Sequence, residues 1–162
     1  MNKAEWLFRK GNISRIEETE KERYLNFFSH SYKENLEHCR FVLVKYPRWS
    51  IISGYYAMHD IAKLFLADKF SIKVNLPVHE AVIILFKELI KDKELAQMLN
   101  LGYDELMKLM NDLVKAKKKR TSMQYYTGTK FMKERYGKEA KKFLETKASP
   151  FVERIRSLRN DN

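Results

Sequence analysis

The chain has 162 residues, with 5 glycines, 3 prolines, one cysteine and a formal net charge of +11. This length suits one domain with a hydrophobic core rather than two, so we expect a single domain over residues 1–162. The longest apolar run, residues 81–86, is far shorter than the roughly 18 residues that span a bilayer. The start of the chain has no secretory apolar core, and one cysteine cannot form an internal disulfide. A cytoplasmic location is therefore expected.

The positive charge is unevenly placed along the chain. From residue 108 onward there are sixteen Lys or Arg against six Asp or Glu, whereas residues 1–107 hold sixteen against fifteen. Such an asymmetry favours an anionic partner, because evenly mixed charge creates no field of one sign. The alternative is a lysine-rich, solvated surface.

Two long helices are predicted in the first half of the chain. Apolar residues recur at three- and four-residue steps over residues 17–46, as in an amphipathic helix. Pro47 is expected to end this helix, because the residue before a proline is pushed out of helical geometry. A second helix is predicted over residues 49–69. It is apolar nearly all round, so it must be buried nearly all round.

A loop over residues 71–77 and a third helix over 78–99 are expected next. Residues 100–106 then indicate a turn, with Asp104 as the N-cap of a fourth helix over about 105–126. No hairpin signal such as Asn-Gly or Asp-Gly is present.

A fifth helix is expected to start near Phe131 or Lys133, after the break at residues 127–129. The Ser149-Pro150 pair either kinks it or begins a short last segment. The fold class is therefore all-α, an up-and-down helical bundle of about five helices.

Two sequence blocks resemble a known family. The first is SGYYAMHDIAKLFLADKF, residues 53–70, after a long helix and a proline-bounded junction, and the second is KKKRTSMQYY, residues 117–126. Over residues 20–158 the chain resembles the HEPN (higher eukaryotes and prokaryotes nucleotide-binding) family. The resemblance implies an all-helical bundle, usually a homodimer, that binds or acts on RNA or nucleotides. It also implies a possible nucleotidyltransferase partner in a toxin-antitoxin pair.

RNA cleavage by the family's usual route is not expected, and whether the chain is an enzyme is left open. Nuclease members of the family depend on an Arg followed, after four to six residues, by a His in a late helix. Here the fifth residue after Arg120 is Tyr125, and no histidine follows His79. A tyrosine, with a pKa near 10, is a poor substitute for an imidazole. Arg23 and His30 match the spacing, but they lie in the first helix. The enzyme alternative is a metal-independent ribonuclease with a non-standard site.

The candidate site for RNA or a nucleotide lies in the late helices. Lysines and arginines neutralise phosphates, and neighbouring aromatic rings stack on unpaired bases. Arg120 is the strongest candidate, because a guanidinium can bind a phosphate bidentately. The plainer interpretation is a solvated helix end whose cations suit the helix dipole. The candidate residues are Lys117, Lys118, Arg120, Tyr125, Tyr126, Lys130 and Arg135.

A second group of residues is assigned to a dimer interface or cleft. In so small a chain, a partner subunit is the simplest cover for both faces of the second helix, so a homodimer is expected. Buried Tyr and His need hydrogen-bond partners, and Asp60 is a candidate. The group consists of Gly54, Tyr55, Tyr56 and His59.

No metal or other cofactor is expected. His30, Glu34 and His38 share one helical face, but three ligands on one helix would still need a fourth from elsewhere. Cys39 is interpreted as a small core residue. A last alternative is that the basic face docks an acidic nucleotidyltransferase.

Overall fold

The computed structural model describes residues 2–119 and 129–160, with side chains described for residues 2–112 and 134–160. The fold is an all-α helical bundle, as predicted. No helix in the described part of the chain is both long enough and apolar enough to cross a membrane. In chain order the elements are α1 (Lys3–Arg9), β1 (Ile13–Arg15), α2 (Glu18–Val42), α3 (Pro47–Phe70), β2 (Ile72–Val74), α4 (Val78–Leu85), the π-helical segment η1 (Phe86–Ile90), α5 (Lys93–Lys119), α6 (Thr129–Phe143), the π-helical segment η2 (Leu144–Ala148) and α7 (Ser149–Asn160).

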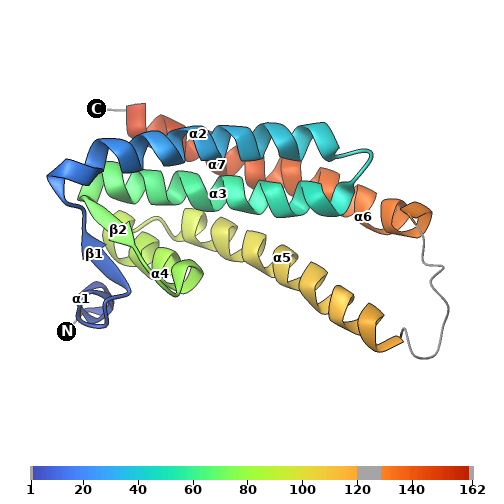
Figure 1. The fold of residues 1–162 in the computed structure, drawn as a ribbon, viewed down its shortest axis with the longest axis horizontal. Helices are drawn as coiled ribbons and strands as arrows, with labels where there is room; N and C mark the ends of the chain where they lie inside the picture. The colour runs from blue at the N-terminus through green and yellow to red at the C-terminus, as the bar shows by residue number, and fades with distance from the viewer. Residues whose placement is uncertain (1, 120–128, 161–162) are drawn as a thin grey trace.

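Helices α2 and α3 form an antiparallel pair along the length of the molecule (Figure 1). The apolar stripe that predicts the first helix faces α3, and its members Phe28, Tyr32, Leu36, Cys39 and Val42 are buried. Cys39 is a fully buried free thiol. The helix ends at Val42, and Pro47 lies in the first turn of α3, where its missing N–H costs nothing.

Helix α3 lies at the centre of the bundle. It contacts α2, α5, α6 and α7 (Figure 1), and Ala57, Met58, Ile61 and Leu64 are fully buried. The prediction that this helix is buried nearly all round is confirmed. Its cover comes from the chain's own helices, so a partner subunit is not required to bury it.

Helix α5 begins at Lys93, well before the position near residue 105 predicted for the fourth helix, and it runs without interruption to Lys119. Lys91 has a left-handed backbone (φ 57) that ends η1. The Asp92 carboxylate then accepts hydrogen bonds from the N–H groups of Glu94 (3.1 Å) and Leu95 (3.0 Å). Asp92 is thus the N-cap, and the N-cap predicted at Asp104 is wrong because that residue lies mid-helix.

The turn predicted over residues 100–106 is also wrong, for a packing reason. Gly102 lies inside α5, and a Cβ at this position would be 3.0 Å from Met58 Sδ and 3.6 Å from Phe143. The glycine therefore allows close packing of α5 on the core rather than a turn.

Helices α6 and α7 are continuous through η2. The N–H of Ser149 bonds to the carbonyl of Leu144, five residues back, and the hydroxyl of Thr146 donates to the carbonyl of Lys142 (2.6 Å). These wide turns precede Pro150, which has no N–H to donate. The Ser149-Pro150 pair consequently begins α7 without a break.

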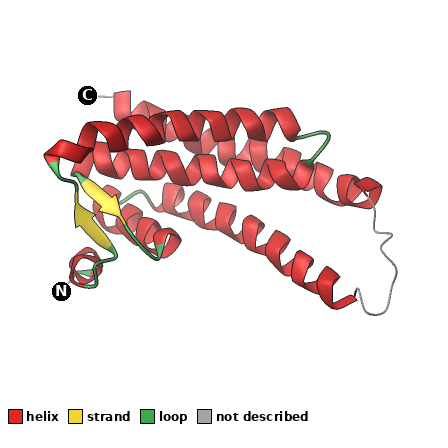
Figure 2. Ribbon diagram, viewed as in Figure 1, coloured by secondary structure: helices red, strands yellow, loops and turns green. Residues whose placement is uncertain are grey.

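A short two-stranded sheet covers one end of the bundle (Figure 2). Strand β1 pairs antiparallel with β2, with Ile13 opposite Val74 and Arg15 opposite Ile72. Ile13, Ile72 and Val74 are buried, so the sheet extends the core. The loop predicted over residues 71–77 is therefore partly a strand, which joins segments about sixty residues apart in the sequence.

Candidate functional site

The predicted binding residues fall largely at the junction of α5 and α6. Lys117 and Lys118 lie in the last turns of α5, and Lys130 lies in the first turn of α6, but their side chains are outside the described part of the chain. Arg120, Tyr125 and Tyr126 lie outside the described residues altogether.

Arg135 is the one predicted binding residue whose side chain is described. Its guanidinium donates to the carboxylate of Asp112 on α5 (3.1 Å), and the same carboxylate oxygen accepts a hydrogen bond from the hydroxyl of Tyr136 (2.6 Å). Tyr136 is buried at 3% exposure. Desolvation, followed by the hydrogen bond to Asp112, raises the pKa of the Tyr136 phenol to about 12. Asp112 therefore joins α5 to α6 near their basic ends.

Cations on α7 are paired with acids from earlier elements. Arg154 donates to both Asp92 and Glu94 at 2.6 Å, and Arg159 donates to Asp68 at 3.0 Å. These ion pairs fasten α7 to α3 and to the start of α5. Part of the C-terminal positive charge is thus neutralised within the described chain.

Most of the residues assigned to a dimer interface are buried in the hydrophobic core of the chain. Tyr55 and His59 are only 4% and 6% exposed. A Cβ on Gly54 would be 2.7 Å from Phe143 Cε1 and 3.1 Å from Cys39 Sγ. The close approach that Gly54 permits is therefore to the chain's own α2 and α6, which corrects its placement at an interface. Tyr56 is the exception, with about half of its surface exposed.

A cluster of aromatic rings joins α3, α4 and α5. The Tyr55 hydroxyl and His79 Nδ1 form a hydrogen bond of 2.8 Å, and the His79 ring stacks on Tyr103 with centroids 3.5 Å apart. Burial, with a smaller contribution from His59, lowers the pKa of His79 to about 4. Burial also raises the pKa of Tyr55. Both groups are therefore neutral near pH 7, and the cluster serves packing.

A buried carboxylate links α3 to α2. Asp60, 7% exposed, accepts hydrogen bonds from the Ser31 hydroxyl (2.6 Å) and the Asn35 amide (3.0 Å). His59 Nδ1 lies 3.9 Å from its other oxygen. Desolvation lowers the pKa of Lys63, and attraction to the Asp60 carboxylate offsets part of this decrease. At 3.9 Å, His59 and Asp60 are close but not joined by a hydrogen bond, and the hydrogen bonds of Asp60 are made to α2.

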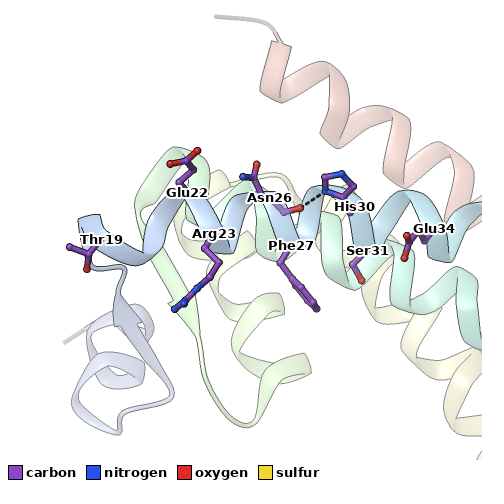
Figure 3. A pocket seen from close by; sticks show the side chains of 8 residues that line it. All are labelled: Thr19, Glu22, Arg23, Asn26, Phe27, His30, Ser31 and Glu34. Atoms are coloured by element: carbon purple, nitrogen blue, oxygen red, sulfur yellow. Dashed lines mark hydrogen bonds between the residues drawn. The ribbon is translucent and has the colours of Figure 1, made fainter.

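Arg23 and His30 lie in an open groove on the outer face of α2. Figure 3 shows that the two side chains point in different directions. The His30 Nδ1–H donates to the carbonyl of Asn26 (2.8 Å) within the same helix. This arrangement does not place an imidazole beside a guanidinium. All residues that line the groove come from α2: Thr19, Glu22, Arg23, Asn26, Phe27, His30, Ser31 and Glu34.

No family model, no curated protein and no solved structure matches this chain. Within the described residues, no group of His, Cys, Asp or Glu is arranged to hold a metal ion. Functional inference therefore depends on the chain's own residues and on how the fold gathers them.

Proposed function

We propose that the chain binds RNA or a nucleotide through the basic junction between α5 and α6. The observation that carries this proposal is the charge of residues 113–133, which contain seven Lys or Arg and no Asp or Glu. This segment accounts for seven of the net eleven positive charges. Lysine and arginine clusters of this density attract phosphates and release counterions when they bind.

The proposal is supported by the position of α5 and α6, since the first ends and the second begins at the same end of the bundle (Figure 1). Asp112 is held by Arg135 and Tyr136, so the last turns of α5 and the first turns of α6 lie at the same end of the bundle (Figure 1). On α7, in contrast, Arg154 and Arg159 are paired with acids. The excess charge is therefore concentrated in one segment of the sequence, residues 113–133.

The test is binding of a labelled single-stranded RNA by fluorescence anisotropy. We expect the triple variant Lys117→Ala, Lys118→Ala, Arg120→Ala to bind at least tenfold more weakly than the wild type, because lost phosphate contacts reduce affinity. A matched variant removes two cations from the described ion pairs, Arg154→Ala and Arg159→Ala, and should bind like the wild type. Equal affinity of all three proteins would reject the proposal.

The HEPN resemblance adds a partner to this proposal. A nucleotidyltransferase in a toxin-antitoxin pair would present an acidic face to the same basic junction. Copurification that is lost in the triple variant, with no RNA affinity in the wild type, would favour that partner over RNA.

A further inference from the structure

Three large aromatic side chains are exposed at the start of α3. Tyr46, Trp49 and Tyr56 have 45%, 51% and 48% of their surface exposed. Trp49 and Tyr56 are seven residues apart, which is two helical turns, so they lie on the same face of α3 about 10 Å apart. Tyr46 precedes the helix, and its carbonyl accepts from the N–H of Trp49 (2.9 Å). We call these three residues the aromatic stripe.

The stripe lies in a segment of the sequence that contains no acidic residues. Residues 38–59 contain no Asp or Glu, and they include Arg40, Lys45 and Arg48. Lys45 Nζ lies over the Tyr46 ring, 5.3 Å from its centroid. The connection between α2 and α3 is also at the end of the bundle where α5 ends and α6 begins (Figure 1). Two acid-free, basic segments thus share one end of the molecule.

We infer that the aromatic stripe is a stacking surface for the unpaired bases of single-stranded RNA whose phosphates bind the basic junction. The inference rests on the proposed function and names its ligand more closely. Exposed Trp and Tyr rings beside cations are the features by which proteins bind single strands, because every base has a π face. A duplex keeps its base faces stacked inside, so the stripe distinguishes single-stranded from double-stranded RNA.

A second copy of the chain is the less suitable occupant of this surface. A two-fold interface brings the same patch of each copy together. At this end it would bring the cations Lys45 and Arg48 of the two copies close to one another, with no acid in residues 38–59 to compensate. Like charges brought together in this way oppose association, whereas an anionic strand relieves the repulsion.

The chain offers an internal control, because it has two tryptophans. Trp49 belongs to the stripe. Trp6 has a similar exposure, 42%, but it lies in α1 at the opposite end of the molecule (Figure 1). Trp6→Phe leaves Trp49 as the sole tryptophan reporter, and Trp49→Phe leaves Trp6. Tryptophan fluorescence is titrated in both variants with oligouridylate and with an RNA duplex of the same length.

We expect oligouridylate to quench the fluorescence of Trp6→Phe and to leave that of Trp49→Phe unchanged. Trp49→Ala should weaken oligouridylate binding about 5- to 100-fold, as base stacking predicts, whereas Trp6→Ala should not weaken it. The duplex should bind more weakly than the single strand and cause no quenching.

The outcomes separate this inference from the proposed function. Binding of RNA that depends on Lys117, Lys118 and Arg120, without quenching of Trp49 and without an effect of Trp49→Ala, would overturn the stripe and leave the basic junction. Concentration-dependent dimerisation that is abolished by Trp49→Ala, again without quenching by RNA, would assign the surface to a second copy. No RNA binding by any variant would reject both proposals.

Discussion

Tyr55 and His79 are joined by a hydrogen bond of 2.8 Å between the phenol oxygen and Nδ1, which ties α3 to the first turn of α4. Tyr103 of α5 stacks on the same imidazole. Three helices therefore meet at one neutral histidine. The sequence places these residues 24 and 48 positions from Tyr55, and no local pattern links them.

This contact predicts a pH dependence of stability. Burial lowers the pKa of folded His79 to about 4, compared with an ordinary value of 6.5. The unfolded chain therefore binds a proton below pH 6.5 that the folded chain does not take up until about pH 4. Stability is full above pH 6.5 and falls as the pH decreases towards 4. We expect a loss of about 1 kcal/mol from this residue, because solvent screens a half-buried group.

Urea unfolding measured between pH 4 and 7 tests this expectation. His79→Gln has no titrating group at this position, so its stability should fall less steeply with decreasing pH than that of the wild type. Burial also lowers the pKa of His59. The stability of the His79→Gln variant should therefore still fall with decreasing pH, but less than that of the wild type. Parallel curves for the variant and the wild type would contradict the role of His79.

Gly54 and Gly137 provide a matched pair of glycine substitutions in helices. Gly54→Ala places a methyl group 2.7 Å from Phe143 Cε1, and overpacking of this kind costs about 1–3 kcal/mol. Gly137→Ala meets nothing within 4 Å and should stabilise the protein by about 0.5–1 kcal/mol, because alanine has the higher helix propensity. Thermal unfolding measures both effects. A stabilised Gly54→Ala variant would show that α3 and α6 are not in close contact.

Asp60 should matter more than a surface carboxylate. Asp60→Ala leaves the hydroxyl of Ser31 and the amide of Asn35 without their acceptor in a buried site, which should cost about 2–4 kcal/mol. Asp68→Ala removes only the partly exposed ion pair with Arg159 and should cost less than about 1 kcal/mol. Chemical denaturation of the two variants gives the comparison. Similar losses would indicate that the Asp60 network is solvated.

The link between α5 and α6 is measurable by a double-mutant cycle. The Tyr136 hydroxyl bonds to Asp112 at 2.6 Å, so Asp112→Ala and Tyr136→Phe should show a coupling energy of about 1.5–3 kcal/mol. The exposed pair Glu153 and Arg156, joined at 3.1 Å within one helical turn, should couple by less than about 0.5 kcal/mol. Additive effects of Asp112 and Tyr136 would contradict the link.

Periodicity was sufficient to predict the fold class and the burial of α3. The apolar repeat over residues 17–46 is set by local helical geometry, and the structure confirms it with α2. The strands β1 and β2 were not predictable in the same way, since three-residue strands leave little pattern and pair across the chain. The turn prediction at Gly102 was wrong because this glycine allows close packing of α5 against Met58 and does not form a turn.

The candidate site was predictable only in part. Charge clustering in residues 113–133 is a property of the sequence. The gathering of α5, α6 and the aromatic stripe at one end depends on tertiary packing (Figure 1). The same tertiary packing explains the correction at Gly54. An apolar helix face in the sequence does not show whether another helix of the chain or another subunit covers it.

The salt dependence of RNA binding tests the central claim most directly. We expect the logarithm of the oligouridylate affinity to fall linearly with the logarithm of the salt concentration, with a slope of about −0.7 for each phosphate contacted. Replacement of Lys117, Lys118 and Arg120 by alanine should make the slope shallower by about 2. An affinity that is independent of salt, or a slope that is unchanged in this variant, would contradict the account.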